Sequence, residues 1–231
     1  MGNFDLLSLF VTQPPKAFDA LDERPRFWFP LLLAIVVGLV TTLWYFKVVD
    51  LTWLLDESTR NTPRMAAMTE EQRRAALQVI SPNMIIIPGV LGVVLVVPIV
   101  HLLGAVYYLL AGKIVNVQRS FRHWFALSTW TALPTLLSAI PAIVILATTG
   151  NGQIDQSSVQ PLSLNELFLH RHMGDPGYSL FVSLSILMPL SWLLAAIGVR
   201  QWSKRSWLFS WIFVLVPSIL IYGCWAWFAL R

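Results

Sequence analysis

The longest apolar run of the sequence, residues 84–111, constrains the fold most strongly. It reads MIIIPGVLGVVLVVPIVHLLGAVYYLLA and contains no Asp, Glu, Lys or Arg. A helix rises about 1.5 Å per residue, so about 20 apolar residues cross the roughly 30 Å hydrocarbon core of a bilayer. The run therefore predicts a transmembrane helix, and we expect a chain that carries it to fold in a membrane.

The composition of the whole chain supports this prediction. Hydrophobic residues make up 56% of the sequence and charged residues 12%, whereas a soluble domain has about 25% charged residues. Cys224 is the single cysteine, which excludes an intramolecular disulfide and a cysteine-based zinc site. The net charge of +4 comes from basic residues beside apolar segments, a pattern that follows membrane topology and predicts no nucleic-acid partner.

Four further apolar segments have the length and the flanking aromatic residues of membrane spans. Together with residues 84–111 they predict five transmembrane helices, the others lying at residues 27–46, 123–148, 178–199 and 207–230. The predicted fold class is all-α, a polytopic membrane bundle of five transmembrane helices with short interfacial helices. We expect two parts, an N-terminal amphipathic segment at residues 1–26 and a transmembrane domain at residues 27–231.

The N-terminal segment has the spacing of two short helices. Its first apolar side chains, three and four residues apart, predict one face of a helix on a membrane surface: Phe4, Leu7 and Val11. Pro15 suits the first turn of a second helix that directs Phe18 and Leu21 to one side. The alternative interpretation is an N-terminal segment that packs against the rest of the protein.

Two connections between the spans carry signals for the start of a helix. Thr69 and Gln72 have the spacing of a capping box, which predicts a helix at residues 70–80. Ser163 with Glu166 three residues later predicts a second helix, with His170 and the following basic residues in its last turn. The pair His170 and His172 is a poor metal site, because residues two apart on a helix do not share a face.

The distribution of basic residues predicts the orientation in the membrane. The loops at residues 113–122 and 200–205 contain Lys and Arg but no acid, as expected of cytoplasmic loops. The N-terminus is then cytoplasmic and Arg231 lies on the opposite side. Four basic residues of these loops form the predicted surface for a protein partner: Arg119, Arg122, Lys204 and Arg205.

His101 is the ionisable residue that we place deep in the bilayer. It precedes Ala111 by ten residues, or about 15 Å along a helix. We predict an intramembrane polar site formed by His101, Pro98, Tyr108, Ser128, Thr131, Thr135 and Ser138. Two interpretations stay open: a neutral imidazole that bonds to the hydroxyl groups and fixes the bundle, or a group that contacts a proton, metal or substrate.

The sequence lacks the signals of common enzyme chemistry. All Asp and Glu lie outside the predicted spans, and the patterns H-E-x-x-H, G-x-S-x-G and G-x-x-x-x-G-K-[ST] do not occur. We therefore predict no catalytic residue, no metal site and no cofactor, and we expect a protein that is not an enzyme.

Several stretches resemble the Yip family, membrane proteins named for binding Ypt/Rab GTPases. They are PPKAFDALDERPRFWFPLLL, MTEEQRRAAL, RSFRHWFALSTWTALPTLL, PLSLNELF and WLLAAIG. The resemblance to a short bacterial-type member implies five spans, a cytoplasmic N-terminus and a periplasmic C-terminus in the inner membrane. It also implies a non-enzymatic interaction or organising protein of membrane homeostasis or trafficking, which contacts lipids and a protein partner and leaves room for a homo-oligomer. The alternative is a small transporter, channel or lipid-handling protein with a site near His101.

Overall fold

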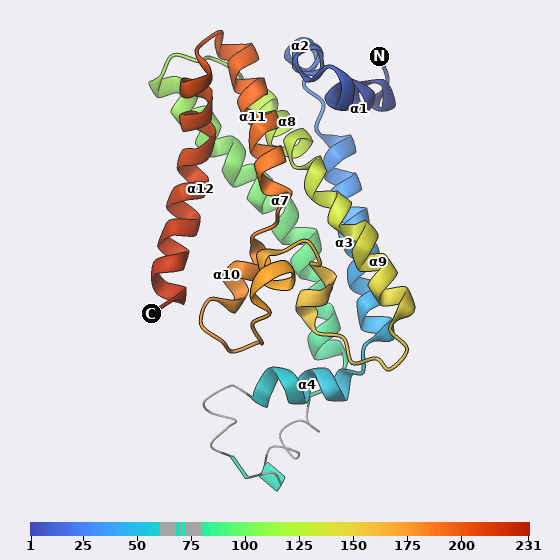
Figure 1. The fold of residues 1–231 in the computed structure, drawn as a ribbon. Helices are drawn as coiled ribbons and strands as arrows, with labels where there is room; N and C mark the ends of the chain where they lie inside the picture. The colour runs from blue at the N-terminus through green and yellow to red at the C-terminus, as the bar shows by residue number, and fades with distance from the viewer. Residues whose placement is uncertain (61–67, 70, 73–79) are drawn as a thin grey trace. The chain divides into compact units, whose positions relative to one another are not determined.

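The computed structural model describes residues 1–60, 68–69, 71–72 and 80–231, and this part of the chain is built from helices (Figure 1). Its contacts define two compact units. Unit 1 contains Met1–Ile35, Leu95–Leu136 and Leu187–Cys224, and unit 2 contains Val36–Val94, Leu137–Ile186 and Trp225–Arg231.

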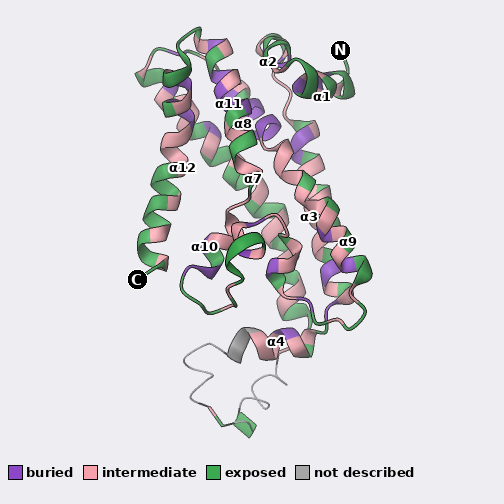
Figure 2. Cartoon of the chain, viewed as in Figure 1, coloured by how far each residue is buried: buried purple, intermediate pink, exposed green. Residues whose placement is uncertain are grey.

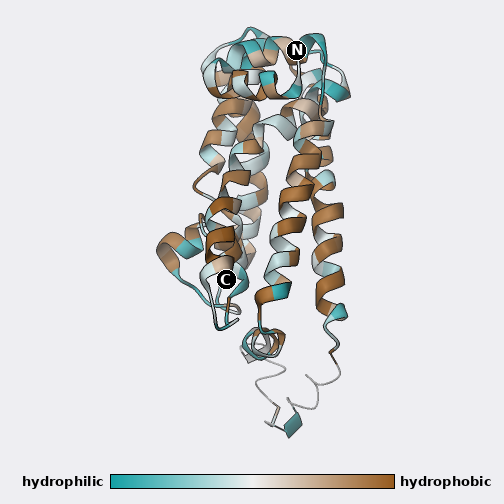
Figure 3. Cartoon of the chain, turned by 90° about the vertical axis from the view of Figure 1, so that its right-hand side faces the viewer, coloured by the Kyte–Doolittle hydropathy of each residue, from teal (hydrophilic) through white to brown (hydrophobic). Residues whose placement is uncertain are grey.

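Four helical stretches among the described residues are long and apolar enough to cross a membrane. They are α3 (Trp28–Val48), α7 (Asn83–Ile114), the continuous run Phe121–Thr148, and α12 (Trp207–Ala229). The run Phe121–Thr148 consists of α8 (Phe121–Thr131), the 3-10 helix η1 (Leu133–Ser138) and α9 (Ala139–Thr148). Hydrophobic residues dominate these stretches (Figure 3). The helical membrane bundle and four of the five predicted spans are therefore confirmed.

The prediction of a fifth span at residues 178–199 is wrong. This segment contains the short helix α10 (Tyr178–Ser183), a non-helical stretch, and α11 (Met188–Ser203). With 16 residues, α11 is about 24 Å long, which is less than the roughly 30 Å thickness of a hydrocarbon core.

The backbone pairing of the non-helical stretch explains this break. The Leu164 N–H donates to the Leu184 carbonyl at 2.7 Å, and the Ile186 N–H donates to the Leu162 carbonyl at 3.0 Å. These groups cannot also take part in a helix. Pro189 then stands in the first turn of α11, where its missing N–H costs nothing. Hydropathy does not reveal such pairing, because the paired residues are as apolar as those of a span.

The N-terminal segment folds into two helices, α1 (Asn3–Thr12) and α2 (Pro14–Glu23). Leu6 and Phe10 are buried, so α1 does pack against the protein, and of its predicted face Leu7 joins this packing in a partly buried position. On that predicted face Phe4 is 76% exposed and Val11 is 80% exposed. The helix thus has one apolar side that packs and another that stays available to a membrane surface.

Unit 1 has an aromatic core to which α1, α2, α8 and α11 contribute (Figure 2). Phe10 stacks on Trp130 with ring centroids 5.0 Å apart, and Phe18 meets the edge of Trp202 at 6.0 Å. Gly198 permits the close approach of α11 to α2, because a Cβ there would lie 2.6 Å from Cε1 of the buried Phe18.

Unit 2 has a smaller core around Tyr45, Leu146 and Ile154. This unit also contains α4 (Leu51–Arg60), a helix that was not predicted. Its start was nevertheless encoded, because Asp50 Oδ1 accepts hydrogen bonds from the backbone N–H groups of Thr52 at 2.9 Å and Trp53 at 3.1 Å. Such an N-cap satisfies donors that the helix itself leaves unpaired.

The predicted capping signals are present in the structure. Thr69 and Gln72 exchange the two capping-box hydrogen bonds at 3.0 and 3.3 Å, although most of the helix predicted at residues 70–80 lies outside the described residues. The Ser163 hydroxyl accepts from the Glu166 N–H at 3.2 Å.

The helix that Ser163 caps is shorter than predicted. It is the single π-helical turn η3 (Asn165–Leu169). His170 adopts a left-handed conformation with a φ of 50°, so the histidines and Arg171 follow this turn. Their predicted place in the last turn of a longer helix is wrong. The Asn165 side chain closes the segment by exchanging hydrogen bonds with the Arg171 backbone at 3.0 and 3.1 Å.

Candidate functional site

The N-terminal helices and the two loops at residues 115–120 and 204–206 gather at one end of unit 1 (Figure 1). Arg119, in the first of these loops, bonds to α2. Its Nε donates to Asp22 Oδ1 at 2.6 Å and its Nη2 donates to Asp22 Oδ2 at 3.0 Å. Two parallel bonds of this kind fix geometry better than a single contact does. The salt bridge therefore ties α2 to the start of α8.

Two side-chain bonds to α2 and one to Arg26, which follows it, reinforce this tie. We call α1 and α2 with these contacts the N-terminal clamp. The indole N–H of Trp202 donates to the Phe18 carbonyl at 3.0 Å, and that of Trp130 donates to the Arg26 carbonyl at 2.6 Å. Gln201 donates to Asp19 Oδ1 at 2.6 Å. Because buried indoles need acceptors, these bonds help to hold the clamp in one position on α8 and α11.

The four residues of the predicted partner surface differ in their contacts. Arg119 is engaged with Asp22, and Arg205 donates to the Val115 carbonyl at 2.6 Å. Arg122 and Lys204 are exposed, and their side chains make no hydrogen bond or ion pair with a described residue. The structure thus separates two internally bound arginines from two basic groups that are available to a partner.

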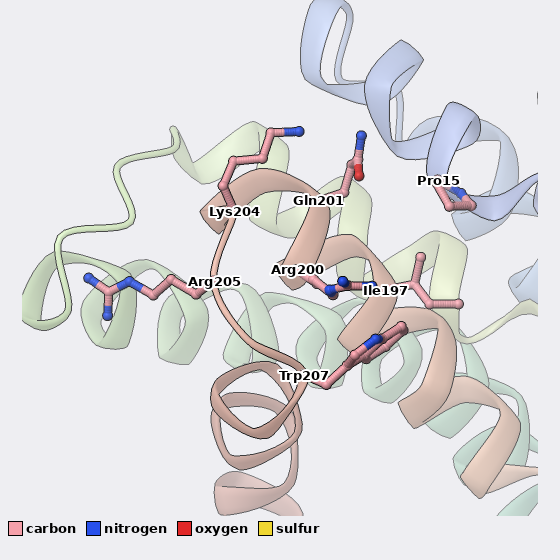
Figure 4. A pocket seen from close by; sticks show the side chains of 7 residues that line it. All are labelled: Pro15, Ile197, Arg200, Gln201, Lys204, Arg205 and Trp207. Atoms are coloured by element: carbon pink, nitrogen blue, oxygen red, sulfur yellow. The ribbon is translucent and has the colours of Figure 1, made fainter.

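Lys204 and Arg205 line one surface hollow of unit 1, with a volume of about 400 Å³ (Figure 4). Arg122 lines a different hollow of about 550 Å³, together with the aromatic residues that lead into α3. Arg119 lines a third hollow beside Lys113. All three hollows combine apolar walls with basic side chains.

The predicted intramembrane site contains one polar contact between helices α7 and α8. His101 Nδ1 lies 3.0 Å from Ser128 Oγ. Gly104, one turn further along α7, allows this approach, because a Cβ there would lie 3.2 Å from the same hydroxyl oxygen. Small residues at a helix contact let a hydrogen bond form between membrane helices.

The other members of the predicted site have different surroundings. Thr131 is buried and donates to the Leu127 carbonyl at 2.8 Å, and Thr135 donates to the Ala132 carbonyl at 2.7 Å. The ring of Tyr108 stacks on Phe213 with centroids 5.7 Å apart. Pro98 lies within α7, which continues through it, whereas Ser138 belongs to unit 2.

None of the hollows described above is lined by His101. Within the described part of the chain, no group of three or more His, Cys, Asp and Glu is placed to hold a metal ion. What the geometry at His101 provides is a hydrogen bond between two helices.

Sequence reasoning missed the partners of the N-terminal clamp. Asp22 and Asp19 belong to the predicted amphipathic segment at residues 1–26, and both accept hydrogen bonds from distant side chains. A usable signal was the set of tryptophans near the ends of predicted spans, since a buried indole N–H usually finds an acceptor. Which carbonyl accepts depends on tertiary contacts that a single sequence does not specify.

Comparison with known proteins agrees with this architecture. The family model of the Yip1 domain matches residues 7–228. No curated protein matches the chain, and no solved structure matches it.

Proposed function

Since this chain belongs to the Yip1 domain family, we propose that it is a non-enzymatic integral membrane protein that organises or recruits a partner at the membrane. Its four apolar helical stretches support contact with lipid along most of their length. We place the end of unit 1 that carries the N-terminal clamp on the cytoplasmic side, because its loops follow the positive-inside pattern.

The observation that carries this proposal is the preformed basic surface around the N-terminal clamp. Asp22 is paired with Arg119, and Asp19 accepts from Gln201, so the clamp's own acids are partly occupied within the protein. Arg122 and Lys204 stay exposed in the same unit. A rigid basic surface attracts an acidic segment electrostatically and binds it with little further ordering.

The contact of His101 with Ser128 supports a structural role for the intramembrane histidine. In the alternative function, a small transporter, channel or lipid-handling protein, His101 would instead face a transported or bound molecule. Replacing it with Gln and with Leu distinguishes the two interpretations, because only the alternative requires the imidazole itself for activity.

Charge reversal tests the proposed partner surface. We expect the amount of partner recovered by affinity purification to fall at least about tenfold in the double variant Arg122→Glu with Lys204→Glu. The reason is that two attractive contacts become repulsive. Arg119 and Arg205 are left unchanged because their internal bonds hold the fold.

The matched control is Lys47→Glu, an exposed lysine at the end of α3 in unit 2, which should leave recovery unchanged. A labelling reporter, Gln118→Cys in a Cys224→Ser background, checks that the orientation in the membrane is preserved. Equal recovery by the wild type and a correctly inserted double variant would contradict the proposal.

A further inference from the structure

The hollow at the junction of α11 and α12 is lined by three basic residues, whereas the hollows that contain Arg122 and Arg119 are each lined by two. Its lining residues include Arg200, Lys204 and Arg205, with no Asp or Glu among the described residues that form its wall. The remaining wall is made by Pro15, Ile197, Gln201 and Trp207. Figure 4 shows these side chains arranged around the turn between the two helices, with Pro15 contributed by α2.

Two of the three cations that line the hollow have no anionic partner among the described residues. The Arg200 guanidinium lies over the ring of Trp207, 4.5 Å from its centroid. The ammonium group of Lys204 forms no hydrogen bond or ion pair with a described residue. Arg205 points away from these two (Figure 4) and donates to Val115 instead. The hollow therefore offers two positive groups that can receive an anion.

The backbone around the hollow adds to this positive potential. The 23-residue helix α12 begins at Trp207, and the first turn of a helix presents unpaired N–H groups with partial positive charge. The Ser206 hydroxyl accepts from the Phe209 N–H at 3.3 Å, which satisfies one of these donors. The end of α11 at this hollow is its C-terminus, which carries partial negative charge. Arg200 and Lys204 bring full positive charges to the same place.

The place of the hollow along α12 indicates what kind of anion fits. Because α12 is a candidate span, its first residue lies where the helix leaves the hydrocarbon. A tryptophan at that level is typical of the interface, and basic pockets there bind lipid headgroups. Ile197 and the Trp207 ring give the hollow an apolar wall, which a free phosphate ion would not use.

We propose that the hollow formed by Arg200, Lys204, Ile197 and Trp207 binds an anionic phospholipid, with its phosphate attracted by the two cations and its glycerol region against the apolar wall. The site shares Lys204 with the proposed partner surface but takes a different ligand. It predicts that the protein retains an anionic lipid at the turn between α11 and α12.

The test is a lipid titration monitored by native mass spectrometry. The full-length protein is first purified in detergent and freed of lipid. Phosphatidylglycerol should bind, and the variant Arg200→Gln with Lys204→Asn should bind it about 30-fold more weakly. Asn is chosen because Lys204 has a φ of 55°, a conformation that Asn tolerates. The charge-preserving variant Arg200→Lys should keep most of the affinity.

The control removes two basic residues from other hollows at the same end, Lys113→Gln with Arg122→Gln, and should change the affinity by less than about threefold. Three results would overturn the proposal: equal binding by the Arg200 and Lys204 variant, equal binding of phosphatidylcholine, or an equal loss in the control. Displacement of the lipid by millimolar inorganic phosphate or glycerol phosphate would show a simple phosphate site and overturn the lipid assignment. Because no protein partner is present, these outcomes are independent of the partner experiment.

Discussion

Helices α7 and α8 follow each other in the chain but contribute very differently to the fold. In α7, with 32 residues, the buried residues are Ala105 and Gly112. In α8, with 11 residues, seven are buried, among them Trp124 and Trp130. The helix with the most extreme hydropathy is thus the less packed of the two, and the shorter, more mixed helix carries the core of unit 1.

This difference reflects two solvents. Apolar side chains of a membrane helix gain little by moving from lipid to protein, because lipid tails are equally apolar. Hydropathy therefore identifies α7 as a lipid-facing span. The packing of α8 instead depends on aromatic shape, close approach at glycine and hydrogen bonds to indoles, which hydropathy does not measure.

Removing one large side chain from each helix should sharpen this comparison most. Trp130 is fully buried, stacks on Phe10 and bonds to Arg26, so Trp130→Ala should cost about 3–5 kcal/mol of stability. Leu103 of α7 is 61% exposed, and Leu103→Ala should cost less than about 1 kcal/mol. Denaturation in detergent or lipid measures both, and equal costs would break the distinction.

Adding one methyl group to a glycine tests the same distinction with a smaller change. A Cβ at Gly198 would lie 2.6 Å from Phe18 and 2.7 Å from Leu127, so Gly198→Ala should destabilise by about 1–3 kcal/mol through overpacking. A Cβ at Gly223 of α12 would meet no other group within 4 Å. There the same substitution should stabilise the helix by about 0.5–1 kcal/mol, and a destabilisation at Gly223 would contradict this view.

The salt bridge of the N-terminal clamp should have an intermediate effect. Its side chains are 28% and 34% exposed, so solvent weakens it, but its two-point geometry places it near the upper end for such pairs. A double-mutant cycle with Asp22→Asn and Arg119→Gln should give a coupling energy of about 1 kcal/mol. A coupling indistinguishable from zero would show that the pair does not hold α2 in place.

The bond between His101 and Ser128 should have the smallest effect. Hydrogen bonds between membrane helices contribute about 0.6 kcal/mol on average, so His101→Leu should lower stability by about that amount. His101→Gln can still bond to Ser128 and should behave like the wild type. If both variants fold but lose activity or support of growth, the imidazole has a chemical role and the structural interpretation fails.

The sequence predicts the local features of this fold well. Four apolar stretches, the proline at the start of α2 and the caps at Ser163 and Thr69 all depend on residues close in the chain. The break at residues 184–187 depends on pairing with residues 162–164, so hydropathy alone predicted a span there.

The candidate sites show the same limit. His101 could be identified from its surroundings in the sequence, and the basic loops could be identified from their charge. The sequence could not predict that Asp22 pairs with Arg119, because the two members of this salt bridge are 97 residues apart. It therefore could not predict that Arg122 and Lys204 would be the basic residues left exposed. The interior face of α1 was also missed, since two apolar faces of a short helix look alike until one of them packs.

Hydrogen–deuterium exchange of the full-length protein in lipid nanodiscs tests most directly whether the N-terminal clamp is a folded part of the membrane domain. Phe18 and Leu21 of α2 are fully buried in the same cluster as Trp130. We therefore predict that the amides of α2 are protected on the same time scale as those of α8, and that Trp130→Ala lowers the protection of both. Amides of α2 that exchange like those of a free segment, while α8 stays protected, would contradict the preformed surface on which the proposed function depends.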